Sequence, residues 1–115
     1  MTDYIIWHNP RCSKSRQTLA LLQDKGIEPT IVEYLKTPPN KVEIRNALEL
    51  LGMEPLALMR RSEKIYKEMQ LEQFKDKDQL VAAMHDNPIL IERPIVFHSG
   101  KAAIGRPPEN VLKIL

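Results

Sequence analysis

One cysteine, Cys12, stands in the sequence NPRCSKSR, between an apolar stretch and a stretch with helical spacing. It therefore falls where a strand ends and a helix begins. Free backbone N–H groups and the positive dipole end of a helix can lower the pKa of a thiol there from about 8.5 to about 3.5–7.5. Arg11, Lys14 and Arg16 add positive charge. A protonated His8 adds more. These residues predict a thiolate nucleophile beside a site for a tetrahedral oxyanion.

A free cysteine is more often a small buried hydrophobe than a reactive group. The neighbours of Cys12 are Asn, Pro, Arg, Ser and Lys, which suit burial poorly and favour reactivity. Since the chain has one cysteine, it cannot resolve itself through an internal disulfide, and reducing equivalents must come from outside. One cysteine and three separated histidines have no metal-ligand spacing, so no metal site is expected.

The elements around Cys12 predict a parallel start to a sheet. Residues 4–8 form a β-favouring run that Asn9-Pro10 stops, and residues 30–34 form a second one. Between them a helix is predicted over 13–25, with Ser13 or Ser15 as its N-cap. A helix between two strands makes a βαβ unit, which favours parallel pairing.

The middle of the chain has a helical pattern, and strands return near the C-terminus. A cap signal at 37–40 opens a helix that runs to Gly52. Further helical pieces are expected at 56–60, 63–69 and 78–85. Strands at 94–98 and 101–104, joined by a tight Ser99-Gly100 turn, form a β-hairpin, and prolines 107 and 108 open a last helix.

Length and composition predict one globular domain over residues 1–115, and the helical block at about 40–88 is not expected to be a separate domain. The net charge of +2 comes from charges spread along the chain, so nucleic acid is not an expected partner. We see no signal peptide and no apolar run of about 18 residues, and we expect a cytoplasmic protein that does not enter a membrane.

Four motifs, taken in order, resemble those of the glutaredoxin-coupled arsenate reductase family, ArsC. They are His8-Asn9-Pro10-x-Cys12-x-x-Ser15-Arg16, Arg60 after Leu-Ala-Leu-Met, Glu92-Arg93-Pro94-Ile95-Val96, and Gly105-Arg106-Pro107. The resemblance covers residues 4–115 and is closest to the short bacterial ArsC-like paralogues, because the longer operon enzymes carry a C-terminal extension.

The resemblance implies an α/β fold of the thioredoxin-like (glutaredoxin-like) type. Its mixed sheet has about four strands, with the helical insertion between the second strand and the C-terminal β-hairpin. Pro94 takes the place of the structural cis-proline, whose loop lies beside the reactive cysteine. An X-Pro bond is where a cis peptide costs little, about 0.5–1 kcal/mol.

The resemblance also assigns roles. Cys12 is the catalytic nucleophile, and His8 and Ser15 tune the thiolate. The oxyanion-binding residues are Arg60, Arg93 and Arg106. The implied reaction converts arsenate to arsenite through a thiol–arsenate adduct that glutathione attacks. The implied partners are arsenate or a similar oxyanion, glutathione as co-substrate, and glutaredoxin; no bound cofactor is implied, and a monomer is expected.

Two other functions use the same scaffold. An Spx-like regulator binds RNA polymerase and usually carries Cys-x-x-Cys as a redox switch, whereas this chain has Cys12-Ser13-Lys14-Ser15. Another thiol-dependent oxidoreductase, acting on a glutathionylated or different oxyanion substrate, is the second alternative, because a fold does not fix a function.

Overall fold

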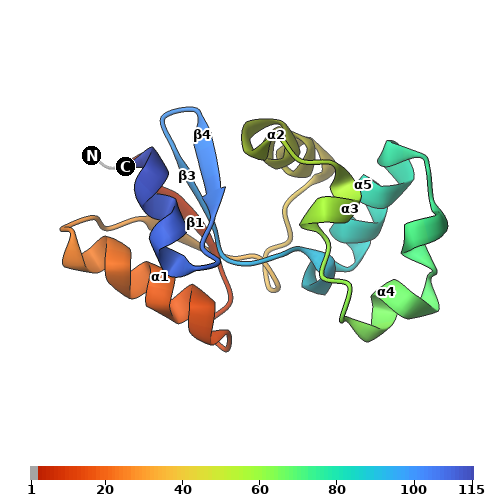
Figure 1. The fold of residues 1–115 in the computed structure, drawn as a ribbon, viewed down its shortest axis with the longest axis horizontal. Helices are drawn as coiled ribbons and strands as arrows, with labels where there is room; N and C mark the ends of the chain where they lie inside the picture. The colour runs from red at the N-terminus through yellow and green to blue at the C-terminus, as the bar shows by residue number, and fades with distance from the viewer. Residues whose placement is uncertain (1–2) are drawn as a thin grey trace. The chain divides into compact units, whose positions relative to one another are not determined.

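The computed structural model describes residues 3–115 and contains a four-stranded mixed sheet in the order β2-β1-β3-β4 (Figure 1). Its strands are β1 (Ile5–His8), β2 (Thr30–Glu33), β3 (Ile95–His98) and β4 (Lys101–Ile104). β1 pairs parallel with β2 and antiparallel with β3, and β3 pairs antiparallel with β4. The predicted mixed sheet and its parallel start are confirmed.

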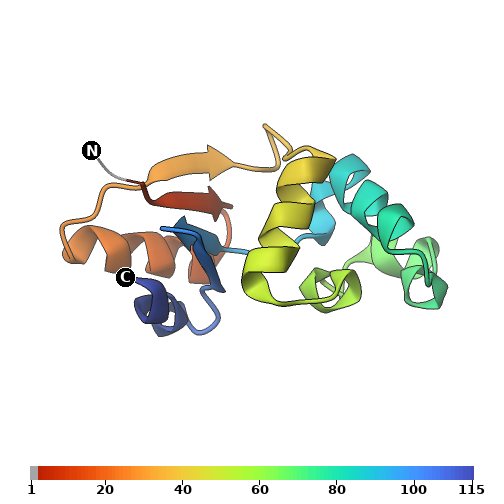
Figure 2. The same cartoon turned by 90° about the horizontal axis from the view of Figure 1, so that it is seen from above.

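The chain folds into two compact units, of which the first contains the sheet. This unit runs to Thr37 and resumes over Arg93–Leu115. Helix α1 (Ser13–Asp24) and the 3₁₀ helix η3 (Pro108–Ile114) lie on one face of the sheet (Figure 2). The register places alternate strand residues on that face. The core there consists of Ile6, Leu22, Val96, Ala103, Val111 and Ile114.

The second unit, Pro38–Glu92, is helical, as the sequence pattern predicts. Its helices are α2 (Lys41–Leu51), α3 (Pro55–Leu58), α4 (Lys64–Glu68), η1 (Leu71–Gln73), α5 (Lys77–Asp86) and η2 (Pro88–Leu90). Asn40 and Glu43 form a capping box at the start of α2, and Gly52 ends the helix in the left-handed conformation. That the two units make one domain stays a prediction.

The C-terminal hairpin turns at Ser99 and Gly100, which both have positive φ (49° and 73°), as a two-residue hairpin turn requires. The last helix is η3, of the 3₁₀ type rather than α, and it begins at Pro108. Neither Pro107 nor Pro108 has a backbone N–H, and the first turn closes by an i to i+3 hydrogen bond from Asn110 N to Pro107 O (2.9 Å). The Arg106–Pro107 peptide bond is cis, which the sequence reasoning missed.

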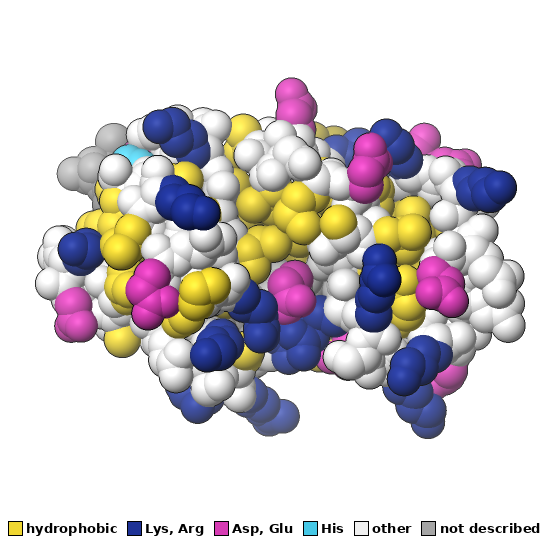
Figure 3. Space-filling model, in the orientation of Figure 1, with side chains coloured by type: hydrophobic (Ala, Val, Ile, Leu, Met, Phe, Trp, Pro, Cys, Tyr) yellow, Lys and Arg dark blue, Asp and Glu magenta, His cyan; other side chains and the backbone are white. Residues whose placement is uncertain are grey.

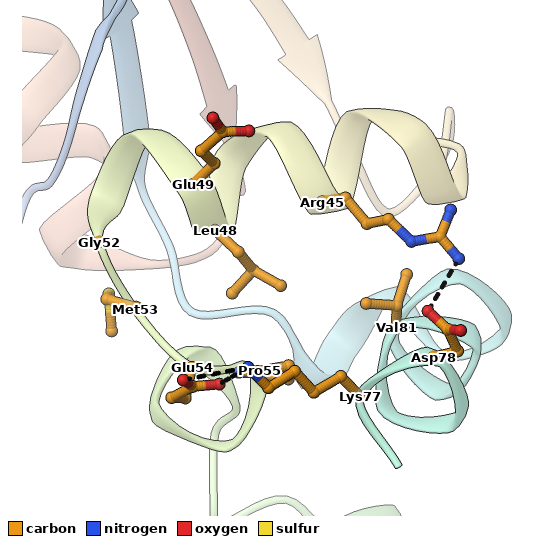
Figure 4. A pocket seen from close by; sticks show the side chains of 10 residues that line it. All are labelled: Arg45, Leu48, Glu49, Gly52, Met53, Glu54, Pro55, Lys77, Asp78 and Val81. Carbon is orange, nitrogen blue, oxygen red and sulfur yellow. Dashed lines mark hydrogen bonds and ion pairs between the residues drawn. The ribbon is translucent and has the colours of Figure 1, made fainter.

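A pocket of about 410 Å³ lies in the second unit, lined by parts of α2, α3 and α5 (Figure 4). Two exposed ion pairs are formed by residues that line the pocket: Arg45 with Asp78 at 3.2 Å, and Lys77 with Glu54 at 3.0 Å. None of the residues that the motifs single out lines this pocket. The chemistry predicted from the sequence therefore lies elsewhere.

Charge is distributed without a single dominant sign. On the face drawn in Figure 3, basic and acidic side chains are interspersed. Among residues 3–115, no helix has both the length and the apolar character that crossing a membrane requires.

Candidate active site

The turn between β1 and α1 places Cys12 at the N-cap of the helix. The backbone N–H of Cys12 donates to Asn9 O (3.0 Å), and its own carbonyl accepts the first helical bond from Arg16 N (3.0 Å). Asn9 Oδ1 accepts from Arg11 N at 3.0 Å, which closes the turn further. The thiol is half-buried at the end of the helix that carries free N–H groups.

Ser15 is fully buried in the third helical position, and its side chain faces back toward β1. Ser15 Oγ accepts from Asn9 N (3.1 Å) and lies 2.6 Å from His8 Nδ1. The prediction that Ser13 or Ser15 caps α1 is therefore wrong, because Cys12 occupies that position. Ser15 instead joins the end of the strand to the start of the helix.

His8 is buried, and burial lowers its pKa; nearby Glu33 opposes this effect and Arg16 adds to it. The lowered pKa favours the neutral form of the imidazole. The ring shares a hydrogen bond with Ser15 Oγ through Nδ1, and its lowered pKa opposes the extra positive charge that a protonated His8 would give. Its tuning of the thiolate stays a prediction.

Two arginines from the far end of the chain meet at Cys12. Arg106 Nη2 donates to Cys12 Sγ at 3.3 Å, and Arg106 Nε donates to Arg93 O at 2.8 Å. Arg93 is buried, and its guanidinium acts on the same thiol. The Arg93–Pro94 peptide bond is cis, the geometry that the family resemblance implies for Pro94.

These surroundings set the ionisation of Cys12. Burial alone raises the pKa of the thiol, but the Ser15 backbone N–H, the Arg93 side chain and the charge of Arg106 together outweigh it. The net result is a pKa below that of an ordinary cysteine. This direction agrees with the expectation of a thiolate nucleophile.

Arg60 lies in the second unit, where two carboxylates bind its guanidinium. Its Nε is 3.1 Å from Glu63 Oε2, and its Nη1 is 2.8 Å from Glu92 Oε1. Burial lowers the pKa of Arg60, but Glu63 and Glu92 more than compensate and raise it. Sequence reasoning missed these two partners, although Glu63 stands three residues after Arg60 and Glu92 is part of a quoted motif. The oxyanion-binding role of Arg60 stays a prediction.

No group of three or more His, Cys, Asp or Glu side chains within the described residues 3–115 could hold a metal ion. The arrangement at Cys12 can hold an anion through arginine forks and present a thiolate to its central atom.

The pH dependence of Cys12 alkylation tests this site directly. Because the folded pKa is lowered, the rate of reaction with iodoacetamide should rise at lower pH in the native protein than in the same protein in urea, where a thiol titrates near 8.5. By linkage, this ionisation stabilises the fold above the unfolded pKa, and the stabilisation is lost as the pH falls through the folded pKa. Equal midpoints in buffer and urea would contradict the lowered pKa.

Replacing Ser15 tests the junction between β1 and α1. Ser15→Ala leaves the buried Asn9 N–H and His8 Nδ1 without this partner, so we expect the free energy of unfolding to fall by about 1–3 kcal/mol. Urea denaturation measures the change. Ser13→Ala, at an exposed position in the same helical turn, is the control and should change stability little. Equal stability of the two variants would refute the structural role of Ser15.

Comparison with known proteins agrees with this geometry. A model of the ArsC family matches residues 7–114, nearly the whole chain. The chain belongs to the ArsC family. One relative, the uncharacterized protein YfgD of Escherichia coli strain K12, is 53% identical over 112 residues, covering 96% of this chain and 94% of its own.

Two other ArsC relatives carry a functional name. The arsenate reductase of Neisseria meningitidis (strain MC58) is 45% identical, and the match covers 100% of both chains. A solved structure of an arsenate reductase from Vibrio cholerae superposes with a TM-score of 0.96 at 49% identity, covering 99% of this chain and 98% of that one. These matches confirm the predicted thioredoxin-like α/β fold of the ArsC type.

Proposed function

We propose that this ArsC-family chain is an arsenate reductase, an oxidoreductase that converts arsenate to arsenite with Cys12 as nucleophile. The observation that carries the proposal is the half-buried thiol at the start of α1, with Arg106 Nη2 at 3.3 Å and a pKa lowered by the Ser15 backbone N–H, Arg93 and Arg106. Relatives named arsenate reductase, identical at 45% over their full length, support the choice of oxyanion.

The proposed chemistry uses the charges at Cys12. Arsenate is a tetrahedral anion, and the guanidinium forks of Arg93 and Arg106 match its oxygens in a way that lysine would not. The Cys12 thiolate attacks arsenic, and one arsenate oxygen leaves as water once protonated, which gives a thiol–arsenate adduct. Arg60 is assigned to oxyanion binding as well, because the family resemblance implies that role.

The electrons come from two thiols. Glutathione attacks the adduct, arsenic accepts two electrons and leaves as arsenite, and Cys12 and glutathione are joined in a disulfide. A second glutathione, with glutaredoxin, then releases Cys12 and yields oxidised glutathione. The single cysteine of the chain supports an external reductant, and a glutathione-containing cytoplasm supplies it. We propose that the protein works as a monomer and holds no cofactor.

A coupled assay tests this function. NADPH oxidation is followed with arsenate, glutathione, glutaredoxin and glutathione reductase, and each component is omitted in turn. We expect NADPH consumption that needs arsenate, glutathione and this protein together, with arsenite as product. Absence of arsenate-dependent turnover, together with retention of RNA polymerase by the immobilised protein, would replace the enzyme with a regulator.

A further inference from the structure

Gly105 stands where the chain leaving β4 meets helix α1, at a point with no room for a side chain. A Cβ atom there would lie 2.8 Å from Pro94 Cγ and 3.0 Å from Thr18 Cγ2, and nearer still to Thr18 Oγ1. These separations are shorter than ordinary carbon contacts of about 3.5–4.0 Å. Any larger residue at this position must therefore displace one of its two neighbours.

Thr18 cannot move away easily. It is fully buried, its β-branched side chain is restricted in χ1, and its hydroxyl donates to Lys14 O at 2.8 Å within the helix. The hydroxyl also lies 3.5 Å from the carbonyl oxygen of Gly105. Thr18 therefore acts as a fixed surface on α1, six residues after the nucleophile at the start of the same helix.

Gly105 is bound to the segment that carries the active-site arginines. Its backbone N–H donates to Pro94 O at 2.9 Å, and the Nε of the next residue, Arg106, donates to Arg93 O at 2.8 Å. The two dipeptides Arg93-Pro94 and Gly105-Arg106 are thus held together. A displacement of Gly105 from α1 would carry both guanidinium groups away from Cys12.

We propose that Gly105 is a positioning residue of this site: its missing side chain lets the paired Arg93-Pro94 and Gly105-Arg106 segments rest on Thr18, at the separation that brings Arg106 Nη2 to Cys12 Sγ. The inference rests on the proposed function only for the role of Cys12 as nucleophile. The arrangement of the thiol and the two arginines is independent of that function. Space, and not backbone conformation, is what Gly105 provides. The other three glycines, Gly26, Gly52 and Gly100, have positive φ and no atom near an added Cβ.

The test is Gly105→Ala, read out by the pKa of the Cys12 thiol from the pH dependence of its alkylation rate. Since Arg93 and Arg106 are among the groups that lower that pKa, moving them away should raise it, toward the value of Arg106→Ala measured alongside. At pH values below the native midpoint, this shift reduces the alkylation rate.

A matched variant separates positioning from loss of stability. Gly26→Ala changes the glycine that ends α1 at φ 77°, so it strains the same unit without a steric clash, and it should leave the thiol pKa where it is. An equal pKa shift in Gly26→Ala and Gly105→Ala would overturn the proposal, as would a folded Gly105→Ala with the wild-type pKa.

A second variant covers the case in which Gly105→Ala does not fold. The double variant Gly105→Ala/Thr18→Ala removes both Thr18 atoms that the new Cβ would meet and leaves the 2.8 Å approach to Pro94 Cγ, so part of the pKa shift should be reversed. A folded double variant with a pKa as high as that of Arg106→Ala would overturn the proposal. The titration uses neither arsenate nor glutathione, so an inactive enzyme with the predicted pKa shifts would refute arsenate reduction and leave the positioning role supported.

Discussion

Cys12→Ser removes arsenate-dependent turnover, by about 10³-fold or more, the scale of loss when an enzyme loses its nucleophile. The change keeps the shape of the side chain and replaces sulfur by oxygen. The serine hydroxyl can still accept the hydrogen bond from Arg106, but its own pKa is too high for the surrounding arginines to ionise it. The fold should be retained, because the substitution keeps the shape of a half-buried side chain, although the stabilisation that comes from ionisation of the thiol is lost.

The coupled NADPH assay measures this loss, with urea denaturation as the check that the variant is folded. Ser13→Ala serves as the matched control, since Ser13 is the next residue and its side chain is exposed. We expect the control to keep most of the wild-type rate. A Cys12→Ser protein that retained a tenth of the wild-type turnover would exclude Cys12 as the nucleophile, whatever its pKa.

The elements that the sequence predicts well are those set by local interactions. Asn40 and Gly52 bound α2 because a cap side chain and a left-handed residue act within one turn of the helix. Ser99 and Gly100 form the hairpin turn for the same reason. Cys12 belongs to this group as well, since its place after a strand and before a helix follows from the neighbouring residues.

The features that the sequence did not predict depend on partners far away in the chain. Ser15 has the residue type of an N-cap, but it contacts His8 on β1 instead. Glu92 binds Arg60 across 32 positions, and Gly105 packs against Thr18 across 87. A local sequence pattern does not indicate which residues pair across such long separations in the chain.

The family resemblance predicted the positions of the arginines only in part. It implied three oxyanion-binding residues from distant motifs, and the first unit does bring Arg93 and Arg106 to Cys12. It did not imply that Arg106 would be held by the carbonyl of Arg93, or that Arg60 would bind two carboxylates. The charge of the three arginines therefore does not show how much each contributes to oxyanion binding. The hydrogen bonds that each guanidinium already makes must be considered as well.

Arg93→Ala should cause the largest loss of oxyanion affinity among changes that leave the thiol in place. Arg93 is buried at the thiol, so its interaction with a bound anion would be poorly screened by solvent. Hydrogen bonds to charged groups contribute about 1.5–3 kcal/mol, which corresponds to a loss of roughly 10- to 100-fold in affinity. The same change also raises the pKa of Cys12, and activity alone would mix the two effects.

Binding and ionisation are separated by working in the Cys12→Ser background, where arsenate can bind but not react. Calorimetry then compares arsenate affinity with and without Arg93→Ala. Arg93→Lys keeps the charge and loses the planar fork, so its arsenate affinity should lie between that of the Cys12→Ser parent and that of Arg93→Ala. Arg45→Ala removes one positive charge from an exposed ion pair in the second unit and should leave the affinity unchanged. If Arg93→Ala binds arsenate as tightly as its parent, the oxyanion is held by other groups, and Arg93 acts on the thiol alone.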